Sequence, residues 1–414
     1  MIDDINVRKD LARELLSAGI DEIDLEMDVP EGQQRPGANL LADLGIEWPE
    51  GLAPIPQPIV PKPSPMKPLP KADVIVIAWT VDELIALADV LTPGFSRDSW
   101  YRYARNFDEY APKIRVGAPA RASKRLGSYF PIEIGKLKVL CMKSELHMNQ
   151  DGIEDKENDP GNATLPVKDF FDQIIEETGA THFITTGTAG GVYTAQDLGD
   201  VVVTRGAKFR LNREFKNASY AGKTYTDDWE VPTKFFKAAE EIMRVHSKTN
   251  LEPAYTPLLP PTAYYTPRTL DLVPKSERQP VPAIWLDGAE QPKLGIGKKM
   301  PKFHPMLTTD FFEFGTSTNN LDEEGSGCEM GDAVLGLIVD ERRKAGKFAP
   351  NWVVVRNMSD PQINGELVAK PSKISQQALW AVYYYKGYGY WTSVNGALAC
   401  WAIIAGLSDQ SADQ

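Results

Sequence analysis

Two acidic residues in this sequence stand where a carboxyl group can act on a bound ligand. Asp360 follows the apolar run Trp352 to Arg356, which predicts a buried strand, and a side chain just past a strand can face a ligand. Glu83 follows an earlier apolar run, in the segment AWTVDEL. A carboxyl group can protonate a leaving group, and a carboxylate can take a proton from water. Alone, Asp360 is also typical of a turn or helix N-cap, and Glu83 of an exposed acid in a first helical turn.

A glycine-rich segment lies between these two residues in the sequence. Residues 185–192 read TTGTAGGV, and glycines after a predicted strand let backbone N–H groups approach a ligand closely. The spacing is neither GxGxxG nor GxxxxGK[ST], which excludes the dinucleotide and P-loop fingerprints. A tight turn after a strand would explain the same glycines. Two more segments enter the argument, TTDFFEF at 308–314 and CEMGDA at 328–333.

Alternating strands and helices must bring these segments together. Continuous β-branched runs predict buried strands, and amphipathic periodicity predicts the helices between them. We therefore expect an α/β fold with a mixed, largely parallel central sheet and helices on both faces, with ligands bound at the carboxyl ends of the strands. The predicted strands are 73–78, 137–142, 182–186, 201–204 and 352–356, and the predicted helices are 81–91, 167–178 and 376–407, the last with a Gly-rich interruption.

Composition divides the chain into three parts. Residues 1–50 have apolar positions at helical spacing and predict a small helical module. Residues 51–71 are rich in proline and predict an extended linker, with a strap packed on the main domain as the alternative. Residues 72–414 form the main domain. Within it, residues 251–306 are a long insertion rich in Pro and Tyr that carries Lys298, Lys299 and Lys302.

The overall composition argues against several classes of function. The 414 residues carry a net charge of −12, so we expect no general affinity for nucleic acid or an anionic membrane. No segment reaches the roughly 18 apolar residues of a membrane span, and the N-terminus lacks a secretory h-region, so we expect a cytoplasmic protein. Cys141, Cys328 and Cys400 show no CxxC spacing and are expected to be buried thiols. No cluster has metal-ligand spacing, so we predict neither metal nor cofactor.

Together and in this order, the quoted segments resemble the nucleoside phosphorylase and nucleosidase superfamily. The resemblance covers about residues 72–407 apart from the insertion. TTGTAGG followed by LGDVVV (198–203), and VVVRNMSD (353–360), are similar to TGSAGG, GDIVV and VVVRAISD of the methylthioadenosine/S-adenosylhomocysteine nucleosidases. SDPQINGEL (359–367) is similar to the end of AMP nucleosidases. The resemblance implies an enzyme that releases a purine base from a small-molecule nucleoside or nucleotide, assembled as a homo-oligomer.

The resemblance also implies the catalytic residues. Asp360 matches the aspartate that protonates purine N7, and Glu83 matches the glutamate that activates water. Breaking an N-glycosidic bond leaves negative charge on the base while the ribose becomes oxocarbenium-like, so an acid at N7 assists it. Phosphorylases carry a phosphate-binding arginine in the loop that here reads AWTVDEL, without a basic residue. We therefore expect hydrolysis, with a phosphate-dependent phosphorylase and a non-catalytic binding relative as the alternatives.

Substrate-binding residues are implied in the same way. They are Phe312 against the base, Met330 under the ribose, and Gly187 and Thr188 near the anion or water. The family has Glu-Met-Glu at the ribose, whereas this chain has Gly331 in place of the last glutamate. One helical position is about 100° of rotation, so Asp332 is not equivalent to that glutamate without a backbone shift. Either Glu329 or Asp332 substitutes for it, or the ribose hydroxyls are held differently.

Basic residues after the GDVVV strand bear on the substrate. Arg205, Lys208, Arg210 and Arg213 lie within nine residues and could meet phosphates on the sugar. We therefore rank a nucleotide such as AMP or ATP above a free nucleoside, with a solvated basic face as the alternative. His147 follows a predicted strand and is either a pocket residue or a structural histidine. Some members of the superfamily deplete nucleotides as antiviral effectors, and an N-terminal module would suit such regulation.

Overall fold

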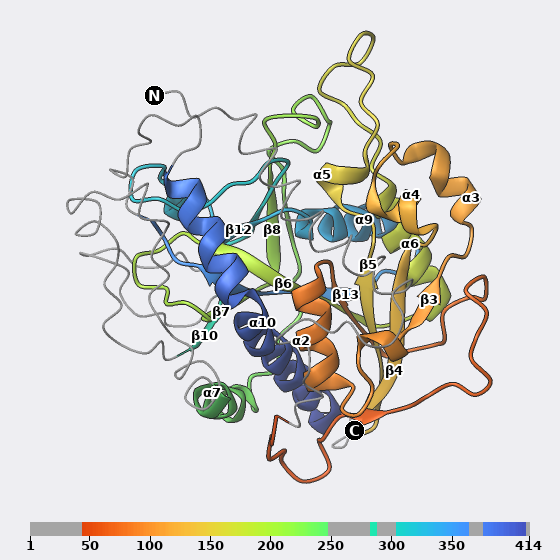
Figure 1. Ribbon diagram of the computed structural model, residues 1–414, viewed down its shortest axis with the longest axis vertical. Helices are drawn as coiled ribbons and strands as arrows, with labels where there is room; N and C mark the ends of the chain where they lie inside the picture. The colour runs from red at the N-terminus through yellow and green to blue at the C-terminus, as the bar shows by residue number, and fades with distance from the viewer. Residues whose placement is uncertain (1–43, 247–281, 288–303, 364–375, 411–414) are drawn as a thin grey trace, which may run out of the picture.

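The computed structural model describes residues 44–246, 282–287, 304–363 and 376–410 (Figure 1). Nearly all of the helical module predicted at 1–50 lies outside the described residues. Most of the 251–306 insertion, including its three lysines, lies outside them as well.

A mixed sheet forms the centre of the fold, as predicted, but it is not largely parallel: six of the twelve strand pairings in the described residues are antiparallel. Strand β6 (His182–Gly191) pairs in parallel with β2 (Val74–Ala78) and β13 (Asn351–Asp360), and antiparallel with β12 (Gly327–Glu329). The sheet order is β1-β4-β5-β2-β6-β12-β11-β8-β9, with β13 paired to β6 and β7, β10 to β7, and β3 to β4. The remaining strands are β1 (Ile55–Pro56), β3 (Tyr101–Tyr103), β4 (Gly127–Ile134), β5 (Leu137–Ser144), β7 (Val201–Thr204), β8 (Gly206–Arg210), β9 (Thr224–Thr226), β10 (Ile284–Leu286) and β11 (Met306–Thr309).

Helices cover both faces of this sheet. Helix α2 (Val81–Leu91) lies beside α10 (Gln376–Gln410) in front of the sheet in Figure 1, and α7 (Phe236–His246) contacts α10. Helix α6 (Pro166–Thr178) packs on α9 (Asp332–Lys344). Phe183 of β6 contacts Phe171 of α6, whereas Thr186, three positions on, lies against Gly396 of α10. Because side chains alternate along a strand, α6 and α10 lie on opposite faces. The short helices are α3 (Phe107–Tyr110), α4 (Pro119–Ser123), α5 (Met148–Asp151), η1 (Arg97–Ser99), η2 (Ala111–Lys113) and η6 (Leu321–Glu323).

Strands β5, β6 and β13 run further than the sequence predicted, β6 and β13 by the most. The glycine-rich residues at the end of β6 continue to pair, with β13 on one side and β12 on the other. Strand β13 continues through Asp360, which pairs with Gly190 across a bulge. Asp360 is therefore the last residue of a strand, not a residue just past it. Glycines that were also compatible with a turn are strand residues because two neighbours hydrogen-bond to them.

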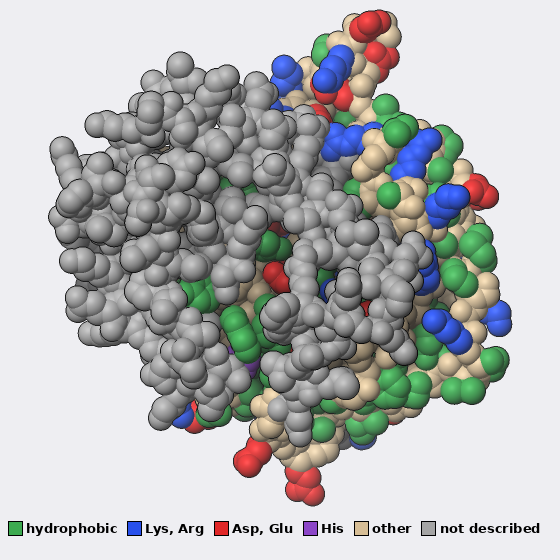
Figure 2. Space-filling view, viewed as in Figure 1, with side chains coloured by type: hydrophobic (Ala, Val, Ile, Leu, Met, Phe, Trp, Pro, Cys, Tyr) green, Lys and Arg blue, Asp and Glu red, His purple; other side chains and the backbone are tan. Residues whose placement is uncertain are grey.

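Helix α10 is continuous, where a Gly-rich interruption was predicted. The segment Tyr388–Gln410 of this helix has the length and composition of a membrane span. However, 94% of its most apolar 18 residues are buried inside the protein. It contacts α2, β13 and β6, so its apolar surface on every side is used in the core. On the described part of the face in Figure 2, apolar and charged side chains are interspersed.

The proline-rich segment packs on the main domain. Ile55 pairs with Glu133 at the edge of the sheet, and the Ile59 N–H donates to the Tyr101 hydroxyl at 2.7 Å. Leu69 is buried, and its N–H donates to Glu177 at 2.7 Å. These contacts describe a strap, the alternative to the linker predicted at 51–71.

Candidate active site

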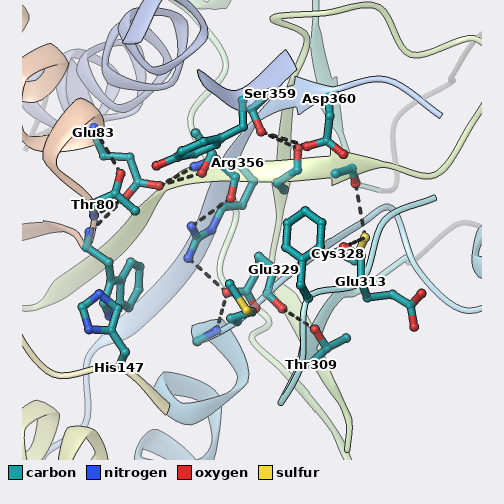
Figure 3. Close-up of a pocket in the computed structure, with 18 residues that line it drawn as sticks. Thr80, Glu83, His147, Thr309, Glu313, Cys328, Glu329, Arg356, Ser359 and Asp360 are labelled. Atoms are coloured by element: carbon teal, nitrogen blue, oxygen red, sulfur yellow. Dashed lines mark hydrogen bonds and ion pairs between the residues drawn. The ribbon is translucent and has the colours of Figure 1, made fainter. Parts of the chain in front are cut away.

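A pocket opens at the carboxyl ends of the central parallel strands, where ligands bind in open α/β sheets (Figure 3). The space within it, including the part open to solvent, is about 740 Å³. Its lining residues are Trp79, Thr80, Glu83, His147, Thr188, Ala189, Gly190, Thr309, Phe312, Glu313, Cys328, Glu329, Met330, Gly331, Arg356, Ser359, Asp360 and Tyr385. Of the residues predicted from sequence, Asp360, Glu83, Phe312, Met330, Glu329 and Thr188 therefore come together, whereas Asp332, Gly187, Arg205, Lys208 and Arg210 lie outside the lining.

Asp360 presents a buried carboxyl group to this pocket. Its side chain is 5% exposed, and the Ser359 hydroxyl donates to Oδ1 at 3.0 Å. Oδ2 has no hydrogen-bond partner among the described residues. A Cβ on Gly190 would lie 3.1 Å from Oδ2, so glycine leaves the space in front of this atom open. Burial raises the pKa of Asp360 to about 7, which keeps much of the group protonated near neutral pH. Such a group can act as a general acid.

Glu83 is a buried residue, not the exposed first-turn acid that was the alternative. It is 4% exposed and forms a capping box with Thr80 at the start of α2. Oε2 accepts the backbone N–H groups of Trp79 and Thr80, both at 2.9 Å. Oε1 accepts the N–H of Thr188 at 2.8 Å and its hydroxyl at 2.9 Å. The carboxylate thus joins α2 to β6 in a fixed orientation at the pocket.

Arg356 binds two acidic side chains at the pocket. Its guanidinium donates to both oxygens of Asp332, at 2.6 and 2.8 Å, and to Oε2 of Glu329 at 3.2 Å. The guanidinium carbon also lies 4.8 Å from the Trp79 ring centre, within cation–π range. Two buried carboxylates thus share one cation. Burial, and then the charge of Asp332, raise the pKa of Glu329 to about 8.

The two carboxylates proposed to replace the missing glutamate occupy different places. Asp332 is fully buried, begins α9, and has both oxygens bound by Arg356. Glu329 lines the pocket. A Cβ on Gly331 would lie 3.3 Å from Trp79, so the indole occupies the space that a side chain at 331 would enter. Of the two, Glu329 is therefore the one that can reach a ligand.

Gly187 lies behind the lining and separates two charged groups. Its φ is +151°, and a Cβ there would lie 2.5 Å from Glu83 Oε1 and 2.6 Å from Arg356 Nη1. An L side chain rarely adopts this φ, and here it would also displace both groups.

We expect Gly187→Ala to cost about 2 kcal/mol of folding free energy through backbone strain, and to lower turnover roughly 10- to 100-fold because Glu83 moves. Urea unfolding and base-release assays measure the two effects. Gly346→Ala is the matched control, because Gly346 has φ +64° and nothing within 4 Å of the added Cβ. If both variants lose turnover equally, crowding at Gly187 has no role in the site.

Three of the four cations after β7 are ion-paired and lie outside the pocket lining, whereas Nε and Nη2 of the fourth, Arg213, are buried without a hydrogen-bond partner among the described residues. The nearest partners are Asp287 for Arg205 at 3.1 Å, Glu324 for Lys208 at 2.9 Å and Glu313 for Arg210 at 2.6 Å. Arg210 comes closest to the site, because Glu313 lines the pocket. The role of these cations in phosphate binding stays a prediction.

Thiols and metal ligands do not add to the site chemistry. The three cysteines are buried and free, as predicted, and burial raises the pKa of the Cys328 thiol well above its usual range. Cys328 Sγ donates to the carbonyl oxygens of Gly190 and Glu313. In the described ranges, no group of three or more His, Cys, Asp or Glu side chains could hold a metal ion.

Sequence reasoning gave no role to several lining residues. Arg356 lies inside the quoted VVVRNMSD segment, and a charged residue inside an otherwise apolar strand was the available signal. Trp79 and Tyr385 also line the pocket, and nothing in their spacing pointed to it. Phe312 is half-buried and lies with its ring 5.8 Å from that of Phe314.

Comparisons with known proteins give structural matches alone. No protein-family model matches the chain, and no curated protein matches it. A 5′-methylthioadenosine/S-adenosylhomocysteine nucleosidase from Neisseria meningitidis, in complex with methylthio-immucillin-A, is 13% identical, with 80% of this chain and 98% of that chain covered and a TM-score of 0.40. The nucleosidase from Colwellia psychrerythraea, in complex with adenine, is 11% identical, with 81% and 96% covered and a TM-score of 0.39. Futalosine hydrolase of Helicobacter pylori is 9% identical, with 80% and 96% covered and a TM-score of 0.40.

The chain is similar in structure to these nucleosidases. At this identity the likeness concerns the fold and assigns neither a substrate nor a residue role.

Proposed function

We propose that this protein hydrolyses the N-glycosidic bond of a purine nucleoside or nucleotide and releases the free base. The observation that carries the proposal is the buried Asp360 carboxyl, which lines the pocket and whose Oδ2 has no hydrogen-bond partner among the described residues. A buried acid with a raised pKa suits a leaving group that needs a proton.

Asp360 acts as the acid. As the bond between C1′ and N9 breaks, its electron pair moves into the purine ring, and Asp360 donates its proton to N7. Phe312 supports the base by packing against its face. Protonation at N7 stabilises the charge that would otherwise build up on the leaving base.

Glu83 and Thr188 hold the attacking water. Glu83 is fixed by backbone donors through Oε2, whereas one of the two donors on Oε1 is the rotatable Thr188 hydroxyl. When water binds, this hydroxyl can turn and free a lone pair of Glu83 for the water proton. The water oxygen then bonds to C1′ as its proton passes to Glu83.

Glu329 and Met330 hold the ribose. Glu329 lines the pocket, and its two oxygens already accept from Thr308, Asp332, Gly331 and Arg356, which fixes the carboxyl group so that a remaining lone pair can accept from a ribose hydroxyl. Asp332 acts through Arg356, which it holds beneath Glu329.

A phosphorylase is the less favoured reading. Phosphate needs unpaired cations, and Arg356 is the guanidinium among the described lining residues, already bound to Asp332 and Glu329. The predicted preference for a nucleotide, AMP or ATP, rests on the basic stretch of the sequence.

Isotope labelling tests hydrolysis against phosphorolysis. The protein is incubated with adenosine in ¹⁸O-labelled water containing phosphate, and the sugar product is identified by mass spectrometry. Hydrolysis gives ribose with the label at C1, whereas ribose 1-phosphate would overturn the proposed reaction.

A further inference from the structure

His147 carries unused hydrogen-bonding groups at the pocket. It follows β5, is 4% exposed and lines the pocket. Within the described parts of the chain, neither ring nitrogen has a hydrogen bond of normal geometry, and the Glu145 backbone makes only a minor contact with the ring. The Asp151 carboxylate accepts the His147 backbone N–H, and the Ser144 hydroxyl bonds to the backbone of Leu146. The imidazole is therefore held in place by its backbone, with its polar atoms left for a ligand.

The imidazole is neutral, and this determines what it can bind. Burial, followed by the charge of Lys143, lowers the pKa of His147 to about 4. A neutral ring has one N–H donor and one acceptor nitrogen. Leaving both unpaired in a buried site is costly. A hydroxyl can pair with either nitrogen, an ionised phosphate can pair with the N–H alone, and a thioether offers little of either kind.

His147 lies at the sugar end of the proposed binding mode. Figure 3 shows His147 on the side of Thr80 and Glu83, with Asp360 on the opposite side of the pocket. A purine whose N7 meets Asp360 places its ribose toward Glu83. The group that extends furthest from the base is the substituent at C5′, so this substituent is the one that reaches His147.

The charges in the pocket disfavour a phosphate at that end. Among the described residues, the lining contains four carboxyl groups, those of Glu83, Glu313, Glu329 and Asp360. The lining guanidinium, Arg356, is committed to Asp332 and Glu329. A 5′-phosphate would thus meet carboxyl groups and, among the described lining residues, no guanidinium left unpaired.

We propose, on the basis of the proposed function, that His147 binds the 5′-hydroxyl of the ribose, and that the preferred substrate is an unphosphorylated purine nucleoside. This reverses the nucleotide preference taken from the basic stretch. A hydrogen bond between His147 and the 5′-hydroxyl would also make the site prefer a nucleoside with this hydroxyl over one with a 5′-thioether.

Substrates that differ at C5′ test this directly. We expect kcat/KM for adenosine to exceed that for 5′-deoxyadenosine, methylthioadenosine and AMP by roughly 10- to 100-fold, the effect of a buried group left unpaired. His147→Phe keeps a ring of similar shape without the nitrogens and should bring adenosine and 5′-deoxyadenosine within about threefold of each other. His147→Asn, which keeps a donor and an acceptor, should retain part of the preference.

His182→Phe is the matched control, because His182 lies at the start of β6 outside the pocket lining and should leave the preference unchanged. Equal cleavage of adenosine and 5′-deoxyadenosine by the unaltered protein, or faster cleavage of AMP, would overturn the role of His147 while leaving hydrolysis intact.

Calorimetry separates this inference from the proposed function. If no compound is cleaved, the proposed function fails, and the affinities still decide the role of His147. Adenosine should then bind at least tenfold more tightly than 5′-deoxyadenosine to the unaltered protein, and equal affinity would overturn the inference.

Discussion

Replacing Asp360 with asparagine should lower kcat/KM for base release about 1,000-fold, because the amide cannot donate the proton that the purine needs at N7. In the unaltered protein, the pKa of about 7 predicts that kcat/KM falls as pH rises through 7, tenfold per pH unit on the alkaline side. A pH profile of initial rates from pH 5 to 9 measures both effects.

Asp89→Asn is the control for this profile. Burial raises the pKa of Asp89 to about 6, yet this residue pairs with Tyr390 outside the pocket lining. Its replacement should leave the alkaline limb where it is. Unchanged turnover in Asp360→Asn would remove Asp360 from the acid role.

The same variant should be more stable than the unaltered protein at alkaline pH. The pKa of Asp360 is raised from 3.8 to about 7, so its proton-linked stability is fully present below about pH 4 and is lost as pH rises through 7. Above pH 7 the buried charge costs at most about 4 kcal/mol, which an asparagine does not incur. Urea unfolding of the ligand-free protein should show a gain of about 1 to 2 kcal/mol at pH 5 that grows to about 4 kcal/mol at pH 8. A gain of equal size at both pH values would contradict this origin.

Replacing Glu83 with glutamine should lower kcat about 100- to 1,000-fold, because an amide oxygen is a far weaker base than a carboxylate. Glutamine can still cap α2, since a capping box accepts either residue, so the loss of stability should stay near 1 kcal/mol. Steady-state kinetics with adenosine, together with urea unfolding, separate the two effects.

Asp82→Asn provides the comparison, because Asp82 is the neighbouring acid in the first turn of α2 and lies outside the pocket lining. It should turn over at nearly the normal rate. If Glu83→Gln matches it, Glu83 caps the helix and takes no part in activating water.

Residue patterns were sufficient to predict the framework of the site. The buried run of β2 and the helical periodicity of α6 gave those elements nearly to their ends, because burial on a face dictates residue type. The ends of parallel strands meet at one edge, which is why Glu83, Thr188 and Asp360 could be expected together.

Sequence patterns could not predict ion pairs and hydrogen bonds between residues that are far apart in the chain. The carboxylates that bind Arg205, Lys208 and Arg210 lie more than 80 positions away in sequence, so a basic stretch looked available for phosphate. The hydrogen bonds of the glycines in β6 depend equally on distant strands. The unpaired nitrogens of His147 became visible only once all its neighbours were known.

Free base release in the absence of phosphate tests the central claim most directly. Purified protein is incubated with adenosine, methylthioadenosine, AMP and ATP, and adenine is resolved by chromatography, with Asp360→Asn in parallel. We predict adenine from the unaltered protein, most rapidly from adenosine, and at most a trace from the variant. Absence of adenine from every substrate, or equal release by the variant, would contradict the assignment of this pocket as a nucleosidase site.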